Sequence, residues 1–168
     1  KLKIIQLLAE LTENMSQGEV HQLMSKGNVE LAEAEYLEVI QRKTAMLFEA
    51  ACRTSAVLAD AAAEKETALA QYGYNLGIAF QMADDLLDYT TDSAVLGKEV
   101  GADLKEGKLT LPVIHALREA GPDDRRKMIE IITDEHFDAS DFKFLIGLLD
   151  QYGGIAYTRQ MAAGHIAT

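Results

Sequence analysis

Cysteine, proline and long apolar runs are all scarce in this chain. Cys52 is the only cysteine among 168 residues, so the chain cannot form an internal disulfide, and a secreted scaffold held by disulfides is excluded. Two prolines and 12 glycines are too few for a collagen-like or linker-dominated chain. No apolar run approaches the ~18 residues that a membrane-spanning helix needs. A lone cysteine fits a reducing compartment, and we expect a cytoplasmic location.

Positive charge is scarce as well. The 16 Lys and Arg residues stand against 27 Asp and Glu residues, which gives a formal net charge of −11. Binding to a nucleic-acid backbone needs clustered Lys and Arg, so we do not expect nucleic acid as a partner. Apolar residues make up 48% of the chain, which is enough to build a core, and the 26% of charged residues argues against disorder.

Helical periodicity dominates the chain, and both prolines, Pro112 and Pro122, lie in its last third. The predicted helices cover residues 1 to about 24, about 31–58, about 65–89, about 110–120, about 123–133 and 140 to about 152, and the last begins near 155. Between Tyr89 and Gly107 the composition predicts an irregular loop. No strand and no internal repeat is expected, so the predicted fold class is all-α, with helices packed as a bundle.

The helix predicted over residues 65–89 carries two contrasting faces. One is an apolar stripe, which we interpret as the core face and which consists of Leu69, Tyr72, Leu76, Phe80, Ala83 and Leu87. The other lies roughly 120° around the helix and consists of Gly77, Gln81, Asp84, Asp85 and Asp88. A solvated surface is the ordinary interpretation of such a polar face, and we interpret Gly77 as a packing residue.

Three aspartates of the polar face occupy positions that do not stabilise a helix. Asp84, Asp85 and Asp88 lie within about one turn, where neighbouring like charges repel by ~0.2–0.5 kcal/mol per pair. They also lie near the C-terminal end of the helix, where its dipole disfavours anions. A bound cation would reverse both penalties, and Mg²⁺ is bound by carboxylates together with waters and phosphate oxygens. The pattern predicts a site for Mg²⁺ and a diphosphate.

The segment after the aspartates combines glycine with lysine. Gly97-Lys98 and Gly107-Lys108 are the two adjacent pairs, and Gly101 lies between them. Glycine permits a close approach of the backbone, and lysine supplies an ammonium group to phosphate oxygens. A solvated loop is the alternative interpretation. Its position directly after the aspartates favours the phosphate site.

These motifs resemble those of trans-isoprenyl diphosphate synthases, the polyprenyl synthetase family. The second aspartate-rich motif and lysine loop of that family match Leu76-Gly-Ile-Ala-Phe-Gln-Met-Ala-Asp-Asp-Leu-Leu-Asp-Tyr89, Leu96-Gly-Lys98, Gly101, Asp103-Leu104 and Gly107-Lys-Leu-Thr-Leu-Pro112. Its Gly-Glu-x-x-Gln element and Lys-Thr segment match Gly18-Glu19 with Gln22, and Tyr36, Ile40, Lys43-Thr44-Ala45 and Leu47. Within the family the chain is most similar to the long-chain octaprenyl and decaprenyl diphosphate synthases.

The resemblance implies an isoprenoid-synthase-type helical bundle and a trans-prenyltransferase. Such an enzyme condenses an allylic diphosphate with isopentenyl diphosphate head to tail, requires Mg²⁺ and is a homodimer. By position, the implied metal ligands are Asp84, Asp85 and Asp88. The residues implied to bind the allylic diphosphate are Lys43, Thr44, Gln81, Lys98 and Lys108, of which the first four are also implied to be catalytic. Phe80 is implied to lie near the isopentenyl group.

The family's first aspartate-rich motif has no match in this chain, because Asp-Asp-x-x-Asp occurs once in the 168 residues. We therefore expect residues 1–168 to form a single helical domain that is incomplete at its N-terminus and at its C-terminus. This middle and C-terminal part is expected to be inactive alone. Two alternatives stay open: a non-catalytic helical partner subunit of a heteromeric prenyl synthase, and a terpene cyclase. The lysine loop and the Thr-Leu-Pro segment argue against the cyclase.

Overall fold

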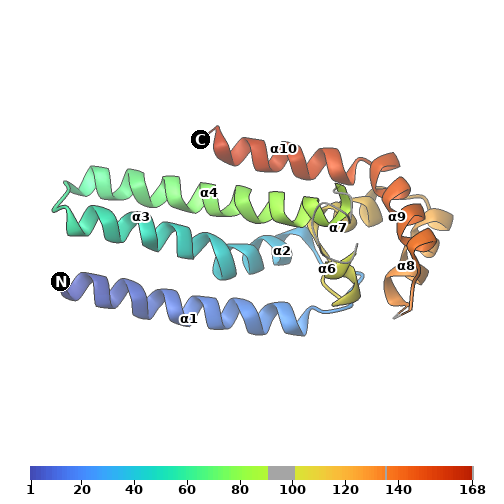
Figure 1. Ribbon diagram of the computed structural model, residues 1–168, viewed down its shortest axis with the longest axis horizontal. Helices are drawn as coiled ribbons and strands as arrows, with labels where there is room; N and C mark the ends of the chain where they lie inside the picture. Colours follow the sequence, from blue (N-terminus) through green and yellow to red (C-terminus); the bar gives the residue numbers. More distant parts are fainter. Residues whose placement is uncertain (91–100, 135, 168) are drawn as a thin grey trace. The chain divides into compact units, whose positions relative to one another are not determined.

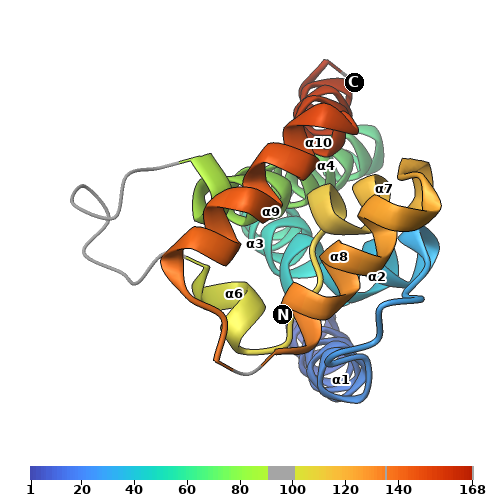
Figure 2. The same ribbon diagram turned by 90° about the vertical axis from the view of Figure 1, so that its right-hand side faces the viewer.

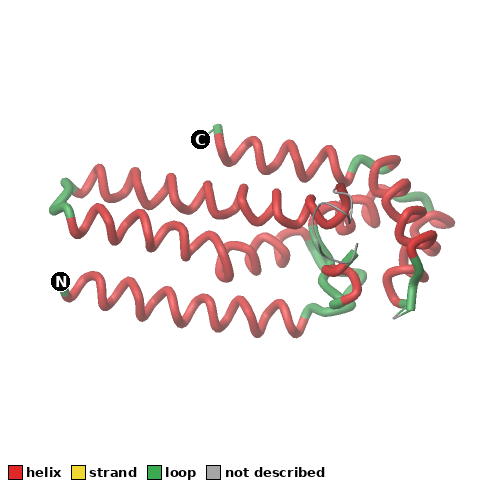
Figure 3. Tube along the Cα trace, in the orientation of Figure 1, coloured by secondary structure: helices red, strands yellow, loops and turns green. Residues whose placement is uncertain are grey.

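A computed structural model describes residues 1–90, 101–134 and 136–167, and it divides the chain into two compact units. The first unit comprises residues 1–24, 37–81 and 162–168, and the second comprises residues 25–36 and 82–161. Every regular element within the described ranges is a helix (Figure 3), which confirms the predicted all-α class. None of these helices is long and apolar enough to span a bilayer.

The first unit is built around long helices. Helix α1 (Leu2–Met24) packs on the π-helical segment η1 (Gln41–Ala45) and on α3 (Met46–Leu58), as Figure 1 shows. The N-terminal part of α4 (Ala63–Thr90) approaches the same pair of segments. The buried apolar side chains of the first unit come from these segments and from residues 37–40: Leu7, Leu11, Val39, Ile40, Ala45, Ala50, Ala56, Val57, Ile78 and Ala79.

The helix predicted over residues 31–58 is interrupted by a wider turn. It consists of α2 (Glu33–Ile40), η1 and α3, and the π-helical η1 contains Lys43 and Thr44. Helix α1 lies close to this turn, because a Cβ atom on Gly18 would lie 2.8 Å from Cβ of Arg42. A π-helical turn adds one residue and keeps the helix continuous, so no helix stop in the sequence marks it.

Helix α4 buries a different face from the one that its apolar stripe predicted. Leu69, Tyr72, Phe80 and Leu87 are 40–61% exposed, so the predicted core face is wrong. The face that packs in the first unit contains Gly73 and Gly77, and a Cβ atom on Gly77 would lie 2.6 Å from Cα of Ala45. Glycine allows two helix backbones to approach closely, and this contact decides which face of α4 is covered.

The second unit contains residues 33–36 of α2 and residues 82–90 of α4, and its other helices are shorter. They are α6 (Ala102–Lys105), α7 (Leu111–Glu119), α8 (Pro122–Thr133), α9 (Ala139–Gln151) and the first part of α10 (Gly154–Ile166). Helices α7 and α8 both pack on α9 (Figure 2), around side chains that include Val113, Met128 and Leu149. Helix α6 lies within the segment predicted to be an irregular loop, and it begins after Gly101 in the left-handed conformation. At four residues it is too short to produce a periodic signal.

Candidate functional site

Asp85 is the most deeply buried acidic side chain of the aspartate motif, with none of its surface exposed. Its Oδ2 accepts a hydrogen bond of 2.7 Å from the hydroxyl of Tyr36. Its Oδ1 accepts one of 2.8 Å from Nζ of Lys108. All three residues belong to the second unit, and they come from α2, from α4 and from the segment that follows α6.

Asp88 and Asp103 extend this group of residues. The two oxygens of Asp88 accept hydrogen bonds of 3.2 Å each from the backbone N–H groups of Ala102 and Asp103, at the start of α6. Asp103 in turn lies 3.1 Å from Nζ of Lys108. We call Tyr36, Asp85, Asp88, Asp103 and Lys108 the Asp85 cluster. It connects the C-terminal end of α4 to α2, to α6 and to the residues just after α6.

The electrostatics of the Asp85 cluster fix its protonation. Burial would lower the pKa of Lys108, but the carboxylates of Asp85 and Asp103 outweigh it and raise that pKa to about 12. Burial, followed by the charge of Asp85, raises the pKa of Tyr36 well above its usual value. Burial and the charge of Asp103 raise the pKa of Asp88, although backbone hydrogen bonds oppose the shift. At neutral pH Lys108 is therefore charged, and Tyr36 is a hydrogen-bond donor.

Asp84 directly precedes Asp85 in α4, and its side chain is exposed. In the described part of the chain, no three His, Cys, Asp or Glu side chains converge as a metal site. Mg²⁺, however, is commonly held by one or two carboxylates, with waters and substrate phosphate oxygens as the other ligands. The exposed carboxylate of Asp84 and the half-buried one of Asp88 are donors of this kind, so the residues fit Mg²⁺.

Lys43 belongs to a polar group in the first unit. Its Nζ donates a 2.6 Å hydrogen bond to Oε1 of Gln22 and lies 2.9 Å from a carboxylate oxygen of Glu19. Next to it in η1, the hydroxyl of Thr44 donates a 2.7 Å hydrogen bond to Oε1 of Gln81. We call Glu19, Gln22, Lys43, Thr44 and Gln81 the Lys43 cluster. It brings together three predicted site residues that lie up to 38 positions apart in the sequence.

Phe80 is 53% exposed, and its ring lies 5.2 Å from that of Phe48, centroid to centroid, within the first unit. An exposed aromatic ring that is held by a second ring can contact an apolar ligand without being part of the core. Lys98 lies outside the described residues.

Tyr36 and Asp103 are members of the Asp85 cluster whose roles the sequence does not indicate. Tyr36 contacts Asp85 across 49 positions of sequence, and no local pattern marks such a pair. Asp103 lies two residues after Gly101 and five residues before Lys108, and this short separation could have indicated its pairing with that lysine.

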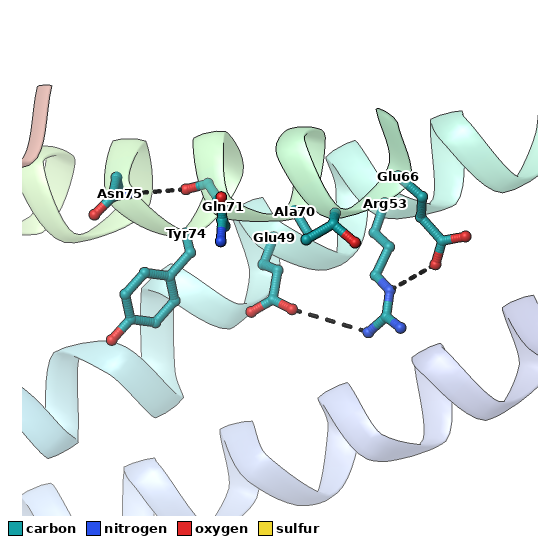
Figure 4. Close-up of a pocket in the computed structure, with 8 residues that line it drawn as sticks. Glu49, Arg53, Glu66, Ala70, Gln71, Tyr74 and Asn75 are labelled. Carbon is teal, nitrogen blue, oxygen red and sulfur yellow. Dashed lines mark hydrogen bonds and ion pairs between the residues drawn. The ribbon is translucent and has the colours of Figure 1, made fainter. Parts of the chain in front are cut away.

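A separate pocket of about 350 Å³ lies in the first unit, and it contains none of the predicted site residues. Figure 4 shows Arg53 between two glutamates of its wall, with Nε 2.9 Å from Glu66 and a terminal nitrogen 4.0 Å from Glu49. The cation of this pocket is therefore already neutralised by two carboxylates.

The family model for polyprenyl synthetase matches residues 1–149. The chain is 40% identical to octaprenyl diphosphate synthase of Escherichia coli over 161 residues, which cover 96% of this chain and 50% of that protein. It is 34% identical to a short chain isoprenyl diphosphate synthase of Methanocaldococcus jannaschii, over 88% of this chain and 50% of that protein.

Solved structures show the same fold. A polyprenyl synthase from Caulobacter crescentus, complexed with calcium and isoprenyl diphosphate, has a TM-score of 0.91 and 39% identity, over 98% of this chain and 50% of that one. A decaprenyl diphosphate synthase from Rhodobacter capsulatus has a TM-score of 0.89 and 37% identity, over 98% of this chain and 51% of that one. The chain thus spans about half the length of the relatives it matches. Together with the motifs on α4 and η1, these likenesses mean that the chain belongs to the polyprenyl synthetase family.

Proposed function

We propose that the complete protein is a trans-prenyltransferase, which condenses an allylic diphosphate with isopentenyl diphosphate head to tail to make a polyprenyl diphosphate. The observation that carries this proposal is the end of α4, where the exposed Asp84 lies next to a buried carboxylate–lysine cluster. The names of the relatives support the same chemistry, because they include octaprenyl and short chain isoprenyl diphosphate synthases.

The Lys43 cluster is proposed to bind the allylic diphosphate. In the structure the ammonium of Lys43 is held between Gln22 and Glu19, so a diphosphate oxygen would replace these acceptors. The hydrogen bond between Thr44 and Gln81 holds two further polar side chains in place for the same ligand. Donors that are fixed before the reaction stabilise developing charge without reorganisation. Lys98, which lies outside the described residues, is proposed to bind the same diphosphate.

Asp84 and Asp88 are proposed to hold Mg²⁺. When bound there, the metal would neutralise the diphosphate leaving group as the carbon–oxygen bond of the allylic substrate breaks. The double bond of isopentenyl diphosphate then attacks the allylic cation, and a proton is lost. Phe80 is proposed to present its exposed ring to the isopentenyl group.

In the direct test, the complete protein is incubated with Mg²⁺, farnesyl diphosphate and labelled isopentenyl diphosphate, and the chain length of the products is measured. Chain elongation supports the proposal. A protein that makes no elongated product contradicts it and favours a non-catalytic partner subunit, whereas a cyclic hydrocarbon favours a terpene cyclase. From the similarity to octaprenyl and decaprenyl synthases we expect long-chain products.

Magnesium dependence, homodimeric assembly and a cytoplasmic location complete the proposal. Chelation with EDTA should abolish elongation, and added Mg²⁺ should restore it. Sedimentation of the complete protein should give twice the mass of one chain. Fractionation of the producing cells should recover the protein with the cytoplasm.

A further inference from the structure

The two oxygens of Asp85 are engaged by side chains from two other segments of the same unit. The hydroxyl of Tyr36 lies 2.7 Å from one oxygen, and Nζ of Lys108 lies 2.8 Å from the other. The carboxylate is completely buried, and the side chain of Lys108 is only 16% exposed. A buried carboxylate is tolerated when it is paired and hydrogen-bonded, and Asp85 meets both conditions.

This environment does not suit a magnesium ligand. Mg²⁺ retains several waters and approaches a carboxylate oxygen to about 2.1 Å, so it needs an oxygen that solvent can reach. Binding to Asp85 would require Tyr36 or Lys108 to move, and it would place a dication beside the charged ammonium of Lys108. Asp84, the preceding residue, has an exposed side chain, which solvent and a hydrated Mg²⁺ can reach.

The contacts of Asp85 belong to a network of hydrogen bonds and ion pairs around the end of α4. Lys108 connects Asp85 to Asp103, and the backbone N–H of Asp103 donates to Asp88, one turn further along α4. The position of the Asp88 carboxylate therefore depends on α6, whose position depends in turn on the pairing of Lys108 with Asp85. Tyr36 adds a connection from α2 to the same carboxylate.

We propose that Asp85 is a positioning residue and not a metal ligand, and that Tyr36 and Lys108 act through it to set the placement of Asp84 and Asp88. Lys108 has the same role and does not bind substrate phosphate. This proposal rests on the proposed prenyltransferase function. Partners of this kind typically change activity by about 10- to 100-fold when they are removed.

The first test compares Asp84→Asn with Asp85→Asn in the complete protein. Both variants remove one negative charge and keep the side-chain shape. Binding of Mn²⁺ alone is measured by electron paramagnetic resonance, so no turnover is needed. We expect Asp84→Asn to weaken Mn²⁺ binding by at least about tenfold and Asp85→Asn by less than about threefold, with kcat of Asp85→Asn reduced about tenfold. Equal losses of Mn²⁺ affinity in the two variants would overturn the proposal.

The second test uses Tyr36→Phe, which removes one hydroxyl and no charge, so it remains informative even if Asp85→Asn fails to fold. We expect kcat to fall about tenfold and KM for both diphosphates to stay within about twofold. Tyr157→Phe is the matched control, because the Tyr157 hydroxyl also donates a 2.7 Å hydrogen bond to a carboxylate, that of Glu33. A purely structural role would lower the melting temperature and leave kcat unchanged in both variants, and that result would refute the proposal.

The two proposals fail in different ways. If the unmodified protein makes no elongated product, the prenyltransferase function is wrong, while the Mn²⁺ comparison still reports whether Asp85 is a ligand. If the unmodified protein elongates and Asp85→Asn loses Mn²⁺ as Asp84→Asn does, only the positioning role is wrong.

Discussion

Gly77 of α4 lies directly against Ala45 of η1, so closely that a Cβ atom on Gly77 would lie 2.6 Å from Cα of Ala45. Ala45 is completely buried. The contact holds α4 against the turn that carries Lys43 and Thr44. This approach to the backbone of Ala45 leaves no room for a side chain at position 77.

Gly77→Ala should therefore destabilise the protein, because the added methyl group meets backbone and not a flexible side chain. We expect a loss of ~1–3 kcal/mol, as for other overpacked sites. Gly147→Ala is the control, since a Cβ atom on Gly147 in α9 would have no atom within 4 Å. That change should stabilise by ~0.5–1 kcal/mol. Thermal unfolding of the complete protein measures both changes, and a Gly77→Ala variant as stable as the parent would contradict the close contact.

Lys43→Met should weaken binding of the allylic diphosphate. Loss of a hydrogen bond to a charged group costs ~1.5–3 kcal/mol, which corresponds to an increase of KM by roughly tenfold or more. Lys143→Met on α9 removes an exposed lysine and should leave KM unchanged. Steady-state kinetics with varied allylic substrate measures the effect. Equal KM values for the two variants would remove Lys43 from the substrate site.

Phe80→Leu should raise KM for isopentenyl diphosphate about two- to tenfold, because an aromatic contact is worth ~0.5–1.5 kcal/mol. KM for the allylic substrate should not change. Stability should change little, since Phe80 is 53% exposed. Phe144→Leu, at a residue that is 46% exposed on α9, is the control for surface aromatic loss. A selective effect on the allylic substrate would assign Phe80 to the other diphosphate.

His115 should make stability depend on pH. Burial, followed by the positive charge of Arg118, lowers its pKa below 6.5, although Glu119 and Glu33 oppose the shift. The folded state thus binds a proton less readily than the unfolded state, so stability is full above pH 6.5 and is lost as the pH falls through the lowered pKa.

The variant His115→Phe keeps a ring stacked on Tyr157, which lies 4.0 Å away between centroids, and removes the titrating group. Melting temperatures of the two proteins should therefore change differently between pH 7.5 and pH 5, with the parent losing more stability. Parallel curves would show that His115 does not contribute to the pH dependence.

Helix positions were predictable from local sequence to a large extent. Spacing of apolar residues and the glycine and proline stops predicted α1, α7, α8 and α9 to within a few residues. The aspartates and lysines of the candidate site were also recognisable, because their residue types and order form a motif. The π-helical turn at Lys43 and the four-residue α6 were not, since no helix stop marks the first and the second is too short to give a periodic signal.

The sequence by itself determined the all-α class and the family, because helical periodicity and short motifs both depend on neighbours within a few turns of the chain. Tertiary structure alone decided which face of α4 is buried, because the close approach of Gly77 to Ala45 outweighs the apolar stripe of that helix. It alone also decided the environment of Asp85. Tyr36 and Lys108 reach that carboxylate from 49 and 23 positions away, and only packing brings such distant segments together.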